Sequence, residues 1–90
     1  MKVVWSDDAV ADLERIHAYW EGSSPKYAAH IANRLLKLVA HLEFPPELGV
    51  RFGEPHSRKL FVGGTPFIVF SDVESERIEL TAVIDARDNP

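Results

Sequence analysis

The first half of the chain places apolar residues at the spacing of two amphipathic helices. A short β-branched and aromatic segment at residues 2–5 (KVVW) comes first and predicts a strand. Ser6 follows as a helix N-cap, and two aspartates occupy the first turn, where the helix dipole favours carboxylates. Apolar side chains then recur at helical spacing, at Ala9, Leu13, Ile16 and Trp20.

A Gly-Ser-Ser turn at residues 22–24 separates this helix from a second one. Ser24 is positioned to cap the second helix, and Pro25 suits the first helical position, which needs no backbone donor. The apolar face that follows is continuous and consists of Ala28, Ile31, Ala32, Leu35, Leu38, Val39 and Leu42. Because proline cannot donate to the helix ladder, Pro45-Pro46 is expected to end the helix, and the two helices form an αα-hairpin.

The second half changes to the shorter period of strands. Residues 45–57 are rich in Pro and Gly and predict a loop, and strands are expected at 58–62 and 67–71, joined through Gly63-Gly64. The segment 67–71 is apolar on both faces, as in a central strand. In the last strand the alternation predicts one buried face, made of Ile78, Leu80, Ala82 and Ile84.

The predicted elements define an α+β fold in the order β-α-α-β-β-β. An N-terminal strand and an αα-hairpin precede a three-stranded antiparallel meander, and the hairpin packs on one face of the sheet. The chain of 90 residues is short enough to be a single domain over residues 1–90. A domain of this size buries only about 60% of the surface that its unfolded chain exposes, so a partner would stabilise it.

Charge and composition exclude several classes of protein. The net charge is −4, and residues 1–50 and 51–90 each hold five Lys/Arg against seven Asp/Glu, so neither half is a basic arm for nucleic acid. There is no cysteine, and the four histidines (His17, His30, His41 and His56) have no metal-binding spacing, so we expect neither a metal nor another cofactor. No segment approaches the ~18 apolar residues of a membrane span, and the start of the chain does not read as a signal peptide, so we expect a cytoplasmic protein.

Five segments, in order along nearly the whole chain, resemble the ParE/RelE superfamily of bacterial toxins. They read VVWSDDAVADLERIHAYW, SPKYAAHIANRL, RFGEPHSRKL, GTPFIVF and VIDARDNP. Within that superfamily the chain looks most like the ParE-like (plasmid stabilisation) branch. The resemblance implies a RelE/ParE-like fold and a toxin of a type II toxin–antitoxin system that arrests growth.

The resemblance also implies partners. Such a toxin is held inactive in a hetero-oligomer with a ParD-like antitoxin, whose C-terminal segment wraps the toxin. The ParE branch is associated with inhibition of DNA gyrase, whereas the RelE branch cuts mRNA in the ribosomal A site. Because the two branches share a fold, the site residues must distinguish them.

Metal-free RNA cleavage needs a base, an acid and cations that stabilise charge on the phosphate. The candidate cations are Arg51, Arg58, Lys59 and Arg87, and the candidate acid or base is His56 or Asp85. These are weak candidates. Ser71 stands where the family often has Tyr, and Asp72 stands where a basic residue often follows.

The sequence therefore favours a toxin that acts by contact rather than as an enzyme, without sequence-specific binding to nucleic acid. Arg58, Lys59, Asp85 and Arg87 are the predicted contacts for the target or the antitoxin, with Arg58 and Arg87 on one exposed sheet face. The alternative for these residues is an Asp85–Arg87 ion pair and an Arg58 that anchors the preceding loop. The alternative functions are a RelE-like ribosome-dependent mRNA interferase and a non-toxic module that binds antitoxin.

Overall fold

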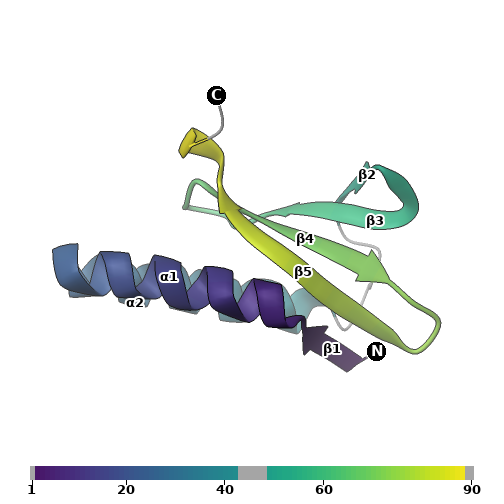
Figure 1. Ribbon diagram of the computed structural model, residues 1–90, viewed down its shortest axis with the longest axis horizontal. Helices are drawn as coiled ribbons and strands as arrows, with labels where there is room; N and C mark the ends of the chain where they lie inside the picture. Colours follow the sequence, from purple (N-terminus) through teal and green to yellow (C-terminus); the bar gives the residue numbers. More distant parts are fainter. Residues whose placement is uncertain (1, 43–48, 89–90) are drawn as a thin grey trace.

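A helical hairpin lies along one face of a twisted sheet, and no described helix covers the other face (Figure 1). The computed structural model describes residues 2–42 and 49–88. Its elements are β1 (Lys2–Trp5), α1 (Asp7–Ser23), α2 (Pro25–Leu42), β2 (Val50–Phe52), β3 (Glu54–Phe61), β4 (Phe67–Val73), β5 (Arg77–Asp85) and the 3-10 turn η1 (Ala86–Asp88). The described strands form a five-stranded sheet in the order β1-β5-β4-β3-β2, in which β1 is parallel to β5 and the other pairs are antiparallel.

Both predicted helix starts are confirmed by their caps. The Ala9 amide donates to Ser6 Oγ at 3.1 Å, and the Tyr27 amide donates to Ser24 Oγ at 3.3 Å. α1 continues through Ser23 and ends where Ser24 adopts an extended conformation. The Pro45-Pro46 stop lies outside the described residues. Neither described helix combines the length and the apolarity that a transmembrane helix requires.

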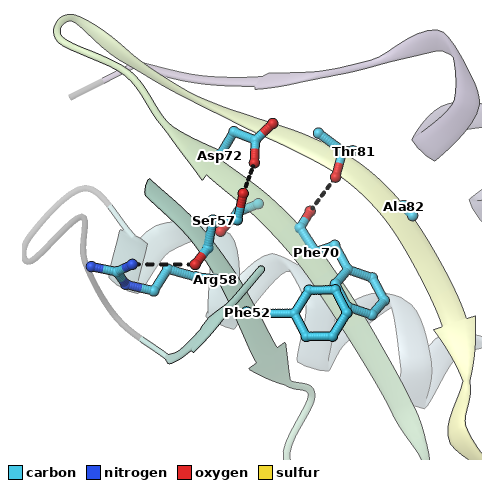
Figure 2. A pocket seen from close by; sticks show the side chains of 8 residues that line it. Phe52, Ser57, Arg58, Phe70, Asp72, Thr81 and Ala82 are labelled. Carbon is cyan, nitrogen blue, oxygen red and sulfur yellow. Dashed lines mark hydrogen bonds between the residues drawn. The ribbon is translucent and has the colours of Figure 1, made fainter. Parts of the chain in front are cut away.

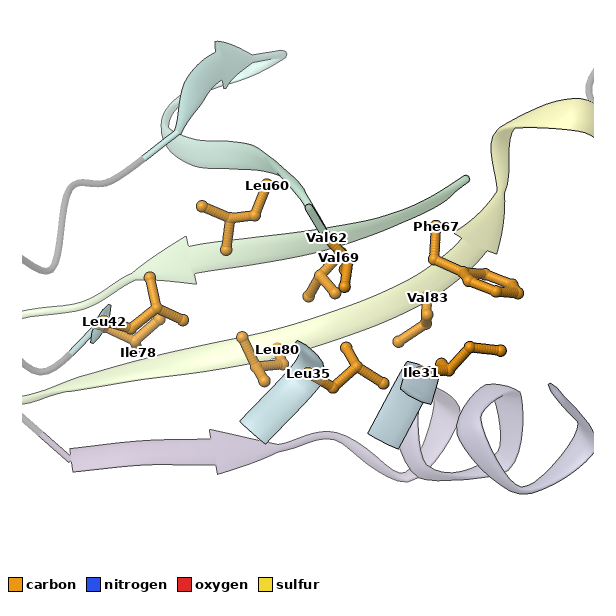
Figure 3. Packing of buried hydrophobic residues seen from close by; sticks show 10 residues of the cluster. All are labelled: Ile31, Leu35, Leu42, Leu60, Val62, Phe67, Val69, Ile78, Leu80 and Val83. Atoms are coloured by element: carbon orange, nitrogen blue, oxygen red, sulfur yellow. The ribbon is translucent and has the colours of Figure 1, made fainter. Parts of the chain in front are cut away.

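The core lies between the hairpin and the sheet. Its buried residues are Ile31, Leu35, Leu42, Leu60, Val62, Phe67, Val69, Ile78, Leu80 and Val83 (Figure 3). The helix side contributes mainly α2, whose predicted apolar face is confirmed, while α1 adds half-buried side chains such as Leu13 and Trp20. β4 is central, as its apolar sequence predicted, because β3 and β5 flank it.

A β-bulge in β5 overturns the predicted alternation of that strand. Phe70 pairs with Ala82 but Ser71 pairs with Leu80, so Thr81 is an extra residue in β5. A bulge moves every later side chain to the opposite face. Val83 is therefore fully buried against the helices, and the prediction that Ala82 and Ile84 face the core is wrong.

The described part of the predicted loop contains a strand and the beginning of another. β2 pairs with β3, and β3 begins at Glu54, so the prediction of an irregular loop is wrong for most of residues 50–57. Two glycines make this ribbon possible. Gly49 has φ +102° and lies so close to β3 that a Cβ would be 2.5 Å from Leu60 Cδ2, and Gly53 turns the chain at φ +68°.

Substitutions on either side of the bulge should distinguish the two registers. Val83→Ala is expected to lower the free energy of unfolding by ~2 kcal/mol, because two fully buried methyl groups are lost. Ile84→Ala removes more atoms, but the side chain is half-buried on the open face. We therefore expect this change to lower the free energy of unfolding by about 1 kcal/mol or less. Urea unfolding followed by circular dichroism measures both. A larger loss for Ile84→Ala would contradict the bulged register.

Candidate functional site

The β2–β3 ribbon brings together most of the predicted cationic residues. In the β2–β3 pairing, Arg51 lies directly opposite Arg58. Arg58 Nη1 donates to the carbonyl oxygens of Pro55 at 2.9 Å and Ser57 at 3.2 Å, so its side chain does anchor the preceding segment. Lys59 lies on the other face of the ribbon, and His56 is exposed and makes no hydrogen bond with a described residue.

The open face of the sheet contains a hollow of about 250 Å³ beside this ribbon (Figure 2). Its lining consists of Phe52, Ser57, Arg58, Phe70, Ser71, Asp72, Thr81 and Ala82. The Ser57 hydroxyl donates to Asp72 Oδ1 at 2.6 Å, and the Thr81 hydroxyl donates to the Phe70 carbonyl at 3.3 Å. The described side chains of this hollow thus include one guanidinium and one carboxylate but no imidazole or phenol, so it lacks a pair of groups that could act as acid and base in RNA cleavage.

Ser71 and Asp72 point to opposite faces of the sheet. Ser71 is opposite Arg58 in β3 and Leu80 in β5, and its side chain faces the core. The residue is 1% exposed, and its hydroxyl has no hydrogen-bond partner among the described residues. A buried hydroxyl without a partner costs about 1–3 kcal/mol. Only Asp72 of this pair therefore contributes a polar side chain to the open face.

Asp85 and Arg87 form a bidentate ion pair at the end of β5. Arg87 Nη2 donates to Asp85 Oδ2 at 2.8 Å, and Arg87 Nε donates to Oδ1 at 3.1 Å. The Arg87 amide also donates to Oδ1 at 2.9 Å. The side-chain hydrogen bond of Arg87 is the main cause that lowers the pKa of Asp85; burial opposes it, and the amide hydrogen bond and the charge of Arg87 add to the lowering.

This ion pair lies at the rim of a second cavity of about 500 Å³ between α1 and the sheet. Arg15, Tyr19 and Trp20 of α1 form the opposite wall. Arg15 is held by Asp12 at 3.1 Å, so each arginine of this cavity has a carboxylate in contact. The cavity is therefore locally neutral rather than basic.

A third cavity of about 430 Å³ follows the groove between α1 and α2. Its lining is largely apolar, and Leu36 is 71% exposed beside it. Glu14 and His17 form the polar rim on α1, and His17 Nε2 is 3.5 Å from Glu21 Oε2. Within residues 2–42 and 49–88, no three His, Asp or Glu side chains are arranged to hold a metal ion.

Comparison with known proteins assigns the family. The sequence model described as "ParE toxin of type II toxin-antitoxin system, parDE" matches residues 3–90. The chain belongs to this ParE toxin family. No curated protein sequence matches it at a significant level.

Two solved structures share the fold of this ParE toxin. The chromosomal ParDE toxin–antitoxin system from P. aeruginosa matches with a TM-score of 0.80 and 22% identity, over 94% of this chain and 95% of that one. The YoeB/ParE toxin from Agrobacterium tumefaciens matches with a TM-score of 0.64 and 14% identity, over 92% and 95%. The α+β fold inferred from the sequence is thereby confirmed.

The structure does not bring Arg58 and Arg87 of this ParE toxin onto one exposed face. Arg58 pairs with Ser71, whereas Asp85 pairs with Phe67 four residues earlier in β4, a separation of about 13 Å along the strand. Asp85 and Arg58 both belong to the helix side of the sheet, so the distance along the strands separates the two sites, and Arg87 lies beyond β5 in η1. The predicted shared surface is therefore wrong, although the alternative reading, an Asp85–Arg87 ion pair, is confirmed.

The sequence reasoning missed Phe52, which is central to the ribbon. Its ring lies 5.0 Å from that of Phe70, and Lys59 Nζ lies 5.0 Å from the Phe52 centroid. The sequence signal for this strand was present in the segment GVRFG at residues 49–53. There an arginine lies between two apolar residues, and a glycine stands at each end. That alternation is the pattern of a short strand with different chemistry on its two faces.

Arg87→Gln is expected to raise the pKa of Asp85, because it removes the charge and the bidentate contact. The native pKa lies below the value of about 3.9 for an unfolded aspartate, so this pair stabilises the fold above pH ~4. That stabilisation is lost as the pH falls from about 4 through the lowered native pKa. Carboxyl NMR titration gives the shift, and urea unfolding between pH 5 and pH 2 gives the linked loss, which should be smaller in the variant. An unchanged Asp85 titration would contradict the assignment.

Proposed function

We propose that this ParE toxin arrests growth by binding DNA gyrase in the cytoplasm and that a cognate ParD-like antitoxin neutralises it. The observation that supports contact over catalysis is the composition of the open sheet face. Phe52 and Phe61 are 49% and 61% exposed there, next to the half-buried Phe70 and Ile84. Exposed aromatic side chains on a strand face are typical of surfaces that bind protein.

The same face lacks what RNA cleavage would require. Among the described residues, its hollow contains one carboxylate, Asp72, which accepts a hydrogen bond from the Ser57 hydroxyl, and no histidine or tyrosine. Arg58 is the one cation in this described lining, so the hollow lacks a second acid–base group to work with Asp72. We therefore propose that the toxin has no nuclease activity of its own.

The groove between α1 and α2 is the proposed antitoxin site. One relative in fold is described as a ParDE toxin–antitoxin system, and the apolar lining of the groove suits the apolar face of an amphipathic helix. Leu36 is exposed at this site and is therefore positioned to contact such a helix. The predicted C-terminal segment of the antitoxin would begin its path around the toxin here.

A second candidate function rests on a separate observation. Arg51, Arg58 and Lys59 lie on one ribbon, and a second relative in fold is described as a YoeB/ParE toxin. These cations are the feature that a ribosome-dependent mRNA interferase would use. Toeprinting on a ribosome–mRNA complex distinguishes this function, since A-site cuts would appear only if it is correct.

Purified toxin is expected to inhibit DNA supercoiling by gyrase and to leave toeprints unchanged. The double variant Phe52→Ala/Phe61→Ala should inhibit roughly tenfold less, because each change truncates an exposed aromatic side chain of the open sheet face. Tyr19→Ala, which truncates an exposed aromatic side chain on α1, is the matched control and should inhibit normally. Growth arrest with unaffected gyrase would contradict the proposed target. Unimpaired growth together with antitoxin binding would identify a non-toxic binding module.

Leu36→Glu is expected to weaken antitoxin binding by at least roughly tenfold, because it places a charge in an apolar groove. Its stability should change little, since the side chain is mostly exposed. Calorimetric titration with the antitoxin encoded by an adjoining reading frame measures the loss. Leu36→Met, which retains an apolar side chain, is the control. Unchanged affinity of the glutamate variant would exclude the groove as the antitoxin site.

A further inference from the structure

β2 (Val50–Phe52) is an edge strand, and no described strand pairs with its outer edge. It is the last strand of the described sheet and pairs only with β3 among the described strands. All of its residues are exposed, and Val50 is 56% exposed despite being apolar. An edge strand offers unpaired backbone donors and acceptors to any further strand.

The two faces of this edge have different chemistry. Val50 lies opposite Lys59 in register, and the Phe52 ring packs on Phe70, so both apolar residues of β2 belong to the open face. Arg51 lies opposite Arg58, whose register partner Ser71 faces the core, so Arg51 belongs to the other face. Along the edge, apolar and cationic positions therefore alternate with the period of a strand.

The cationic face is not neutralised within the described part of the chain. Like charges placed directly across a sheet destabilise it, with Cβ atoms about 5 Å apart. No described carboxylate forms a salt bridge with Arg51 or Arg58, and the bonds of Arg58 go to carbonyl oxygens. The ribbon 49–61 holds three Arg/Lys and one Glu in a chain of net charge −4. A carboxylate supplied by a partner would relieve this repulsion.

The edge is also fixed in position before any partner arrives. The Phe52–Phe70 ring contact and the Lys59 ammonium over Phe52 hold β2 to the open face. Gly49 lets the chain approach β3 so closely that no side chain would fit there. A preformed edge reduces the ordering cost of adding a strand.

We propose that the outer edge of β2 binds an extended segment of a partner protein in which apolar and acidic residues alternate. The segment adds to the sheet as a further strand. Its acidic side chains face Arg51 and Arg58, and its apolar side chains lie beside Val50 and Phe52. The inference goes beyond the proposed function and does not depend on gyrase or on the α1–α2 groove. A nucleic acid fits less well, because Arg51 and Arg58 lie on one face, whereas the other face presents Val50 and Phe52 and its one cation, Lys59, lies over the Phe52 ring.

The test uses the full chain and a synthetic peptide of about eight residues, the length of an ordinary strand, that alternates valine and glutamate. Fluorescence anisotropy should show binding, and amide NMR should show perturbation and slowed exchange at residues 50–52. Two control peptides should bind at least roughly tenfold more weakly. One has the same composition with the glutamates and valines in separate blocks, and the other alternates valine and lysine.

Arg51→Glu reverses the charge and gives a readout that misfolding cannot imitate. This variant should no longer bind the valine–glutamate peptide and should bind the valine–lysine peptide instead. Lys26→Glu, a matched reversal on α2, should leave both affinities unchanged. The proposal is overturned if the blocked peptide binds equally well, if no peptide binds at millimolar concentration, or if the perturbed amides lie elsewhere. It is also overturned if a single-stranded oligonucleotide binds more tightly than the peptide and displaces it.

Discussion

The junction between α1 and the bulge of β5 determines the arrangement of the remaining structure. The Ser6 amide and hydroxyl donate to the carbonyls of Leu80 and Thr81, and Asp12 Oδ2 accepts from the Val83 amide at 3.0 Å. These bonds join the first turns of α1 to β5 on both sides of the extra residue. They use backbone groups of β5 at and beyond Leu80, where its pairing with β1 ends, so the start of α1 satisfies groups that β1 does not reach.

The bulge sorts the side chains of β5 between two functionally different faces. Val83 completes the core under the helices, and Asp85 follows it to the helix side, where Arg87 neutralises it. Ala82 and Ile84 turn instead to the open face and extend the apolar surface around Phe70. The position of one inserted residue therefore separates a neutral cavity beside α1 from the apolar open face of the sheet.

Local charge, rather than net charge, distinguishes the surfaces of this acidic chain. α1 carries carboxylates near its start and keeps Arg15 paired with Asp12, so this helix offers little free positive charge. The β2–β3 ribbon concentrates cations that no described carboxylate balances. Interactions between exposed charges fall off within about 8–10 Å at physiological salt, so such a cluster acts locally whatever the total charge.

Much of the fold could be predicted from local patterns, because each signal and its consequence lie within a few residues. Ser6 and Ser24 cap helices through their own first turns, and the face of α2 follows from its period. The ribbon was missed because β2 is three residues long and takes its stability from Phe70 of another strand. Of the candidate site, the Asp85–Arg87 pair was predictable because its members are two residues apart.

The sequence by itself determined the order of elements, the helical hairpin, the central strand and the family to which the chain belongs. Only the tertiary structure decided which face each residue of β5 and of the β2–β3 ribbon presents. The physical reason is that register depends on hydrogen bonds between strands far apart in the chain. One inserted residue, Thr81, reverses the facing of every residue after it, and no local pattern in the strand records that insertion.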